Sequence, residues 1–338
     1  MTENSKSNNA PEGKSRVLAL STTALGDTLL SCPAMESLAR HFRLDVIVHQ
    51  RQYPLVENLP GIQGVFTYRN NGLHRAWLGL RLGRRPYKYL VVLHSNHDIL
   101  KLLARLKYQK AANLQGWQDE SLHLEALPRD TSRHMLLNRL ELVKWTGAEA
   151  IDRPMRVYLH SRELAQGRSW LRQKSLLSSK GLVAICPGAA DSYKQWPAKK
   201  FGALARNLMG QGFAVVQIGA GNEAGLLRQV QEFAGQPLPA AMGVDLRLLA
   251  AILANVNLLI TNDTGPMHLA QAVDTPVLAL FGPTDPNYLG PRQKPHRILS
   301  VHLDCEPCLG RECQNPVCME QLALEDVEQS ALEILGRD

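Results

Sequence analysis

The stretch that begins at Val256 constrains the fold of this chain most. The apolar run Val256–Ile260 is typical of a buried strand, and it leads into the polar turn Asn262–Gly265. A helix is expected from Pro266, because proline in a first helical turn loses no intrahelical hydrogen bond. The unpaired N–H groups of that turn and the positive end of the helix dipole form an anion site. The sequence therefore predicts a strand–turn–helix unit that binds an anion at its turn.

Three polar side chains flank this predicted anion site: the carboxylate of Asp263, the hydroxyl of Thr264 and the imidazole of His268. We interpret the group as the diphosphate and sugar site of an enzyme that uses a nucleotide sugar. Local helix capping is the alternative for Asp263 and Thr264, and a packed surface histidine is the alternative for His268.

The same alternation of strand and helix runs through two halves of the chain. In the first half the expected strands are Arg16–Ser21, Leu44–His49, Val65–Tyr68 and Tyr89–Leu93. In the second half they are Leu182–Cys186, Phe213–Ile218, Asn257–Thr261 and Val277–Phe281. Short apolar strands separated by helices indicate parallel sheets covered on both faces. We therefore predict an α/β protein with two Rossmann-like domains facing each other across a central cleft.

The length of 338 residues suits two domains of roughly 150 residues each. We expect a disordered tail at 1–15, an N-terminal domain at 16–165, a linker or hinge at 166–180, a C-terminal domain at 181–323 and a last helix at 324–338. The tail lacks the apolar core of a signal peptide, and no apolar run approaches about 20 residues. These features predict a cytoplasmic protein.

The formal net charge of +7 favours anionic partners such as acidic lipid or a phosphorylated substrate. The alternative is a surface with a mild excess of basic residues. The charge is not accompanied by a nucleic-acid-binding motif, so we expect no nucleic-acid partner. The basic clusters are Arg81, Arg84, Arg85 and Lys88, and then Lys199 and Lys200.

Four cysteines crowd the segment 305–318 with the spacing C-x2-C-x4-C-x4-C. Four thiolates can close a tetrahedral metal site, so a structural metal is one interpretation. Reduced buried thiols and a conditional disulfide are the other two, since a cytoplasmic setting disfavours permanent disulfides. The residues are Cys305, Cys308, Cys313 and Cys318.

Ionisable side chains also follow other expected strands, at the sheet edge where α/β proteins bind ligands. Asp27 follows the first strand and offers a carboxylate for proton abstraction, or else caps the helix after it. Lys194 offers a compact positive charge to a diphosphate, or else is a solvated loop lysine. Glu223 lies in the sequence Gly219–Ala224, which fits the dinucleotide pattern G-x-G-x-x-A. That pattern alone suggests a nicotinamide-dependent oxidoreductase, but no acidic partner follows at the expected interval.

Together these loops resemble glycosyltransferase family 9, the lipopolysaccharide heptosyltransferases. The resemblance covers about Val17 to Leu335 and includes the cysteine-rich tail. The matching pieces are A-L-G-D-T at 24–28, P-G-A at 187–189, K-Q-W-P at 194–197, T-N-D-T-G-P-M-H-L-A at 261–270 and L-F-G-P-T-D-P at 280–286.

The resemblance implies a GT-B fold and an inverting glycosyltransferase that needs no cofactor for catalysis. It implies transfer of heptose from ADP-L-glycero-D-manno-heptose to the inner core of lipopolysaccharide in a Gram-negative cell. The implied acceptor is lipid A–Kdo or an already heptosylated core. The protein would then work peripherally at the cytoplasmic face of the inner membrane. A transferase of the same fold that uses another nucleotide sugar stays open.

The resemblance also assigns residues, with Asp27 as general base and Lys194 on the donor phosphates. Thr23 and Gly26 fall on the acceptor side. The donor-binding positions are Glu223, Asp263, Thr264, Gly265, Pro266, His268, Ala189 and Ala190. The two alanines depart from members that place hydroxyl groups there, which leaves more of the phosphate charge to Lys194 and the helix amides.

Overall fold

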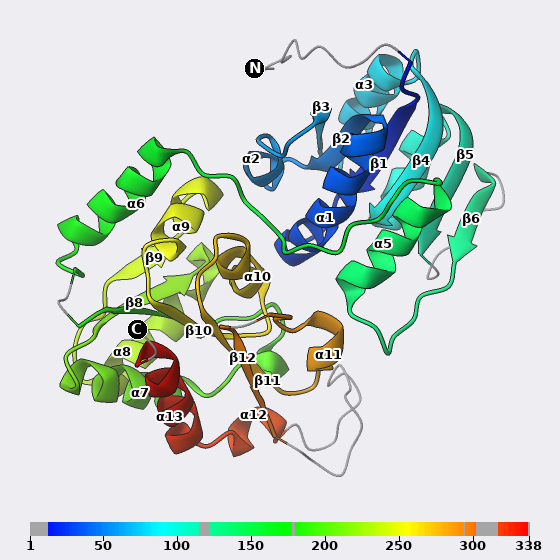
Figure 1. The fold of residues 1–338 in the computed structure, drawn as a ribbon. Coiled ribbons are helices and arrows are strands. Elements are labelled where there is room, and N and C mark those ends of the chain that lie inside the picture. Colours follow the sequence, from blue (N-terminus) through cyan, green and yellow to red (C-terminus); the bar gives the residue numbers. More distant parts are fainter. Residues whose placement is uncertain (1–12, 115–121, 178–179, 294, 302–316, 337–338) are drawn as a thin grey trace. The chain divides into compact units, whose positions relative to one another are not determined.

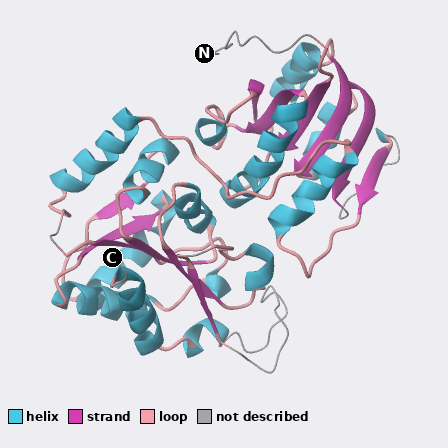
Figure 2. Cartoon of the chain, viewed as in Figure 1, coloured by secondary structure: helices cyan, strands magenta, loops and turns pink. Residues whose placement is uncertain are grey.

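The computed structural model describes residues 13–114, 122–177, 180–293, 295–301 and 317–336. The chain divides into two compact units, Met1–Tyr158 and Leu159–Asp338 (Figure 1). Each unit is built on one parallel six-stranded sheet with helices packed against it (Figure 2). The α/β class with two Rossmann-like sheets is therefore confirmed.

The sheet of the first unit has the strand order β3-β2-β1-β4-β5-β6. Its strands are β1 (Arg16–Ser21), β2 (Arg43–His49), β3 (Ile62–Tyr68), β4 (Pro86–His94), β5 (Lys107–Leu114) and β6 (Leu124–Leu127). All neighbouring pairs are parallel. This is the order of a doubly wound nucleotide-binding fold, in which the chain reverses its direction of travel between β1 and β4.

The helices of the first unit cover this sheet, and α1 packs against α5. They are α1 (Leu25–His41), α2 (Tyr53–Val56), α3 (Gly72–Leu82), α4 (Leu100–Leu103) and α5 (Met135–Trp145), with a 3-10 turn at His97–Ile99. Leu18, Leu20 and Ile47 from the strands join Leu78 and Leu82 from α3 in one buried cluster.

The second unit repeats the same topology, with the order β12-β11-β10-β7-β8-β9. Its strands are β7 (Leu182–Cys186), β8 (Ala214–Gly219), β9 (Ala240–Met242), β10 (Leu258–Asn262), β11 (Val277–Phe281) and β12 (Arg297–Ser300). Its helices are α6 (Ser161–Gln173), α7 (Ala198–Gly210), α8 (Ala224–Ala234), α9 (Leu246–Leu253), α10 (Gly265–Ala272), α11 (Pro286–Leu289), α12 (Cys318–Gln321) and α13 (Leu324–Leu335). Here the reversal lies between β7 and β10, the counterparts of β1 and β4.

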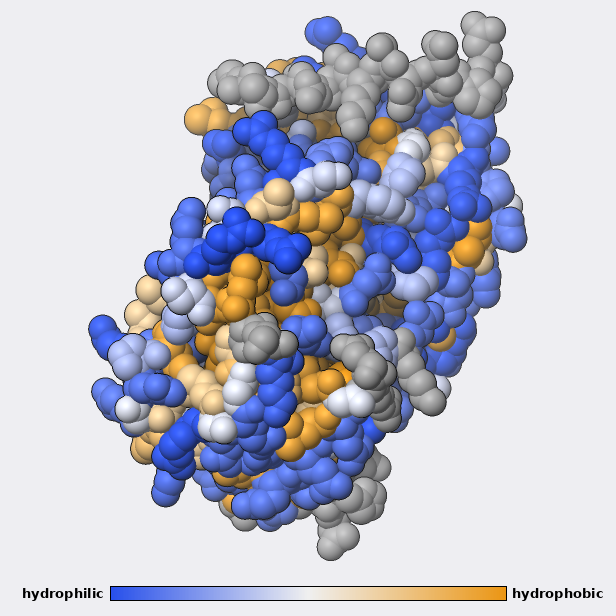
Figure 3. Space-filling model, turned by 60° about the vertical axis from the view of Figure 1, so that its left-hand side comes forward, coloured by the Kyte–Doolittle hydropathy of each residue, from blue (hydrophilic) through white to orange (hydrophobic). Residues whose placement is uncertain are grey.

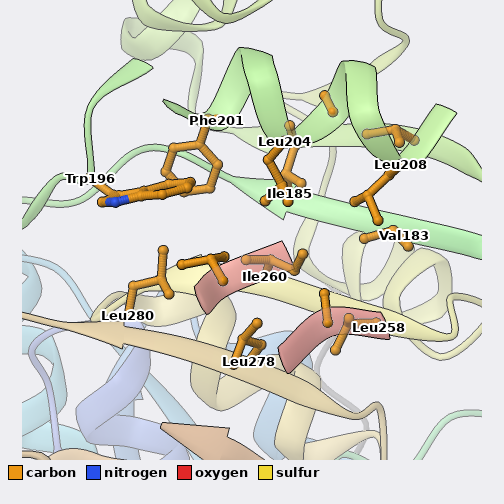
Figure 4. Packing of buried hydrophobic residues seen from close by; sticks show 14 of the residues in the cluster. Val183, Ile185, Trp196, Phe201, Leu204, Leu208, Leu258, Ile260, Leu278 and Leu280 are labelled. Atoms are coloured by element: carbon orange, nitrogen blue, oxygen red, sulfur yellow. The ribbon is translucent and has the colours of Figure 1, made fainter. Parts of the chain in front are cut away.

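The core of the second unit forms between α7, α13 and the middle of the sheet (Figure 4). Phe201, Leu204 and Leu208 form an apolar stripe on α7, and all three are fully buried. The ring of Trp196 meets that of Phe201 edge to face, with 5.0 Å between centroids. Not all apolar side chains are inside, since Figure 3 shows hydrophobic areas between hydrophilic residues on one face of the molecule.

Helix α6 packs on α9 within the second unit. A Cβ atom at Gly167 would lie 2.4 Å from the carbonyl oxygen of Ala251, so this contact needs glycine. Arg247 Nε also donates to Glu163 Oε1 at 2.6 Å. The division of the chain before Leu159 thus groups α6 with the second unit. The expected domain ends and the hinge at 166–180 stay predictions.

Four edge or near-edge strands, β5, β6, β9 and β12, were not predicted from the sequence, because they are short or carry polar residues.

None of the helices in the described part of the chain combines the length and apolar character needed to cross a bilayer.

Candidate functional site

A lysine and a carboxylate from different loops pair at the carboxyl edge of the second sheet. Lys194 Nζ lies 2.8 Å from Asp263 Oδ2, and Thr284 Oγ1 donates to the same oxygen at 2.9 Å. Lys194 follows β7, Asp263 follows β10 and Thr284 follows β11. These three strands are neighbours in the sheet, so their carboxyl ends bring the three side chains together.

The loop that carries Lys194 is held by buried hydrogen bonds. The Trp196 backbone N–H donates to Asn262 Oδ1 at 3.0 Å, and Asn262 Nδ2 donates to the Pro187 carbonyl at 2.8 Å. The Trp196 indole N–H donates to the Leu322 carbonyl at 3.1 Å. Because Asn262 and Trp196 are both fully buried, these bonds hold the position of Lys194 relative to the end of β10.

Helix α10 starts directly behind Asp263. Thr264 occupies the N-cap in an extended conformation, with Pro266 in the first turn. Within the described part of the chain, the Thr264 side chain accepts no capping hydrogen bond from α10. Asp263 instead pairs with Lys194. His268 lies in the buried part of α10 rather than on the surface. The first N–H groups of α10, next to an ammonium group, can receive an anion.

Glu223 lies against the turn that follows β7. Its Oε2 accepts from the Ala220 N–H at 2.7 Å, and a Cβ at Gly188 would come within 2.0 Å of Oε1. Gly188 is therefore required for the carboxylate to approach the backbone. Ala189 is buried and Ala190 is exposed on the same turn. The turn, Glu223 and the Lys194–Asp263 pair thus occupy the carboxyl ends of adjacent strands.

The first unit has its own polar cluster, centred on Asp27 in the first turn of α1. Arg139 of α5 is fully buried, and its Nη2 lies 2.8 Å from Asp27 Oδ1. Its other terminal nitrogen donates to the Asp27 carbonyl and to Ser31 Oγ. Thr23 Oγ1 donates to Asp27 Oδ2 at 3.1 Å, and His94 Nδ1 lies 3.6 Å from that oxygen. Gly26 immediately precedes Asp27 on α1.

The charge states of this cluster follow from its surroundings. Burial is the largest single effect on the pKa of Asp27 and raises it. The charges of Arg139 and His94 and the hydrogen bonds from Arg139 and Thr23 together outweigh burial and hold the pKa below its ordinary value of 3.8. Burial lowers the pKa of His94, and Arg139 lowers it further, against the opposing effect of Asp27. At neutral pH Asp27 is therefore ionised and the imidazole is uncharged, which makes Arg139 the cation that pairs with Asp27.

The hydrogen bonds also assign the tautomer of His94. Thr23 has one hydroxyl hydrogen and donates it to Asp27, so its oxygen accepts from His94 Nδ1 at 2.5 Å. The neutral ring then leaves Nε2 unprotonated. The cluster offers two proton acceptors, the carboxylate of Asp27 and the free nitrogen of His94.

Each cluster lies at the point where the strand order of its sheet reverses. This point falls between β1 and β4 in the first unit and between β7 and β10 in the second. Crevices for ligands in open α/β sheets form at these points. Asp27, Lys194, Glu223 and Asp263 were predicted from the sequence, but the partners that tertiary packing supplies were not. His94 could have been found, because it directly follows an expected strand. Arg139 could not, because an arginine within a helix carries no sign of burial.

The cysteine prediction falls mostly outside the described residues, which include Cys318 but not Cys305, Cys308 or Cys313. Cys318 begins α12 and is partly buried. Within the described ranges, no three His, Cys, Asp or Glu residues are grouped closely enough to hold a metal ion. The metal interpretation of the cysteines stays a prediction.

The chain matches the model of a known enzyme family. The family model described as glycosyltransferase family 9 (heptosyltransferase) matches residues 101–318, more than half of the chain. Lipooligosaccharide heptosyltransferase 2 of Haemophilus influenzae is 26% identical over 300 residues, which cover 81% of this chain and 85% of that protein.

Two solved structures share the fold. A family 9 glycosyl transferase from Veillonella parvula superposes with a TM-score of 0.82 at 20% identity, covering 96% of this chain and 98% of that one. The E. coli ADP-heptose lps heptosyltransferase II has a TM-score of 0.74 at 18% identity, covering 95% and 99%. At these identities the likeness concerns the fold alone.

Replacing the carboxylate of Asp27 tests the buried ion pair. Asp27→Asn leaves the buried Arg139 charge unpaired, so we expect the free energy of unfolding at pH 7 to fall by about 3 kcal/mol. Because the pKa of Asp27 is lowered in the folded protein, the ion pair stabilises the fold fully at pH values above 3.8, the ordinary pKa of this carboxyl group. This stabilisation is lost as the pH falls through the pKa of Asp27 in the folded protein. The difference between wild type and Asp27→Asn in urea denaturation should therefore shrink in acid.

Glu149→Gln, at an exposed position of the same unit, is the matched control and should change stability little at either pH. A difference between wild type and Asp27→Asn that is equally large at neutral and acidic pH would contradict the assigned ion pair.

Proposed function

The chain belongs to glycosyltransferase family 9, the heptosyltransferase family, and on that premise we propose that it transfers heptose from ADP-L-glycero-D-manno-heptose to the inner core of lipopolysaccharide with inversion. The relatives support this reaction by name, since one is a lipooligosaccharide heptosyltransferase and another an ADP-heptose enzyme. The acceptor would be lipid A–Kdo or a heptosylated core, reached at the cytoplasmic face of the inner membrane.

The observation that carries the donor half of the proposal is the Lys194–Asp263 pair beside the start of α10. The Lys194 ammonium has three N–H donors, and only one is needed for the 2.8 Å contact with Asp263. The others are available to diphosphate oxygens, together with the first N–H groups of α10. Asp263, Thr264 and His268 would then meet the sugar and phosphates, and Glu223 the ribose.

The departure of ADP places developing negative charge on the diphosphate oxygen. A preorganised ammonium group and helix amides stabilise such charge more strongly than water does, because they need no reorganisation during the reaction. Ala189 and Ala190 supply no hydroxyl groups here, so Lys194 and the amides carry the neutralisation.

The acceptor half of the proposal rests on Asp27. Its carboxylate is ionised at neutral pH and is held in place by Arg139 and Thr23. A carboxylate of lowered pKa is a weak base toward a resting hydroxyl group. We therefore propose that it takes the proton late, after bond formation to the anomeric carbon has made the hydroxyl acidic. Thr23 and Gly26 would line the acceptor's approach to this carboxylate.

Two alternatives differ in their support. A transferase of the same family that uses another nucleotide sugar stays open. The oxidoreductase alternative has no support left, because the chain is a family 9 glycosyltransferase. The fingerprint segment also follows β8, away from the reversal between β7 and β10, and its Ala220 amide is occupied by Glu223.

A donor panel tests the proposed reaction. The enzyme is mixed with defined truncated lipopolysaccharide cores and with ADP-heptose, ADP-glucose, UDP-glucose or GDP-mannose, and the released nucleoside diphosphate is measured. We expect release with ADP-heptose and a heptose-deficient core. Release with a different sugar nucleotide alone would establish the alternative donor.

Removing the Lys194 ammonium tests the donor site. Lys194→Ala should weaken ADP binding about 10- to 100-fold, because a charge-assisted contact to the diphosphate is lost. Isothermal titration calorimetry measures the affinity, and Lys199→Ala, at an exposed lysine on the same segment, should leave it unchanged. Equal affinities of wild type and Lys194→Ala would refute this role.

Removing the Asp27 carboxylate tests the base. Asp27→Asn should retain ADP binding and lose transfer by about 100-fold or more, because the proton acceptor is gone. Both are measured at a temperature where the variant is folded, with Glu149→Gln as control. Normal turnover would exclude Asp27 as base and leave His94 Nε2 as the acceptor to test by His94→Gln.

A further inference from the structure

Helix α3 carries a stripe of exposed apolar side chains, which we call the α3 stripe: Leu73, Trp77 and Leu80. Their exposed fractions are 88%, 43% and 72%. In the described part of the first unit, these three are all of the exposed large hydrophobic residues. Their spacing of i, i+4 and i+7 places them along one face of the helix.

The opposite face of α3 is the one that belongs to the core. Leu78, Gly79 and Leu82 are buried, and Leu78 and Leu82 are members of the core cluster. A Cβ at Gly79 would lie 2.8 Å from the Arg105 side chain, so the helix sits close against the segment after α4. Since this face anchors α3, the α3 stripe is not needed for the core and is available to a partner.

The α3 stripe lies in the most basic segment of the chain. Residues 58–118 contain ten Lys or Arg and a single acidic residue, Asp98. The rest of the chain carries 28 Lys or Arg against 30 Asp or Glu, so this segment holds all of the net positive charge. The Arg81 guanidinium lies over the Trp77 ring at 5.5 Å from its centroid. The exposed basic residues on this segment include Arg69, Arg81, Arg84, Lys101 and Arg105.

We propose that the α3 stripe and its basic surroundings dock on an anionic lipid bilayer. Leucine and tryptophan on one helix face, bordered by arginine and lysine, are the composition of helices that lie in a membrane interface. The apolar side chains enter the headgroup region, and the long basic side chains reach anionic phosphates. Tryptophan suits this boundary because its ring is apolar and its N–H is polar.

The positive charge of this segment favours an anionic lipid surface over a second copy of the chain as the partner of the α3 stripe. A second copy of the chain would bring an equally basic surface against this one, and the two would repel. The purpose of docking rests on the proposed function, since a lipid-anchored acceptor lies at a membrane. The docking itself depends only on the α3 stripe and the charges around it.

Co-sedimentation with vesicles tests the proposal on the full chain without donor or acceptor. We expect binding to phosphatidylcholine vesicles that contain phosphatidylglycerol, much weaker binding to phosphatidylcholine alone, and release by salt. The double variant Leu73→Ser/Leu80→Ser should bind these vesicles at least about tenfold more weakly than wild type. Phe233→Ser, a matched exposed apolar position on α8 of the second unit, should bind like wild type.

A charge variant and a fluorescence readout separate the two parts of the surface. Arg84→Gln/Lys101→Gln should reduce binding and its salt dependence while leaving the apolar stripe intact. The fluorescence of Trp77 is obtained as the difference between the emission of wild type and that of Trp77→Phe. This difference emission should shift to the blue when anionic vesicles are added, which reports entry of the Trp77 ring into the bilayer.

Failure of wild type to bind anionic vesicles, or undiminished binding by the double variant, would overturn the proposal. Self-association of wild type in analytical ultracentrifugation that the double variant abolishes would overturn it in favour of a second copy as occupant. Transfer to a water-soluble deacylated acceptor, measured in parallel, reports on the proposed reaction independently. Normal vesicle binding without heptose transfer would therefore reject the reaction and retain the docking surface.

Discussion

The reversal of strand order in each parallel sheet is the constraint on which the rest of this structure depends. In each unit, crossovers from neighbouring central strands leave toward opposite sides, β1 and β4 in the first and β7 and β10 in the second. The carboxyl ends of these strands are therefore not covered by one continuous connection, and polar loops can lie side by side there. The Asp27–Arg139 cluster and the Lys194–Asp263 cluster occupy these two positions.

The two clusters use buried charge in opposite ways. In the first unit the cation is inside, because Arg139 is fully buried while 23% of the Asp27 side chain is exposed. In the second unit the carboxylate is the more buried partner, with Asp263 at 7% and Lys194 at 15%. Each buried partner holds a more accessible charge of the opposite sign. The more exposed partner is thus an anion in the first unit and a cation in the second, and the proposed roles of Asp27 and Lys194 rest on these charges.

The burial of each strand explains whether it was predicted from the sequence. Central strands such as Leu182–Cys186 and Val277–Phe281 were found at the residues that the structure gives them, because strands buried on both faces are continuously apolar. The edge strand β6 has the sequence L-E-A-L, and β5 begins with K-Y-Q-K, so burial on at most one face removed the signal. Helix α3 was not among the predicted elements, and only the structure shows that two opposite faces of it are apolar.

The sequence by itself determined the α/β class, the repetition of the strand–helix unit and the loops that bear Asp27, Lys194, Glu223 and Asp263, since each follows from local periodicity and from polar residues after apolar runs. Only the tertiary structure decided which side chains meet. Arg139 pairs with Asp27 across 112 positions of sequence, and Lys194 pairs with Asp263 across 69. Such pairs arise because elements distant in the chain become neighbours in the fold: α1 packs on α5, and β7 lies beside β10. This packing is a property of the folded chain rather than of any local pattern.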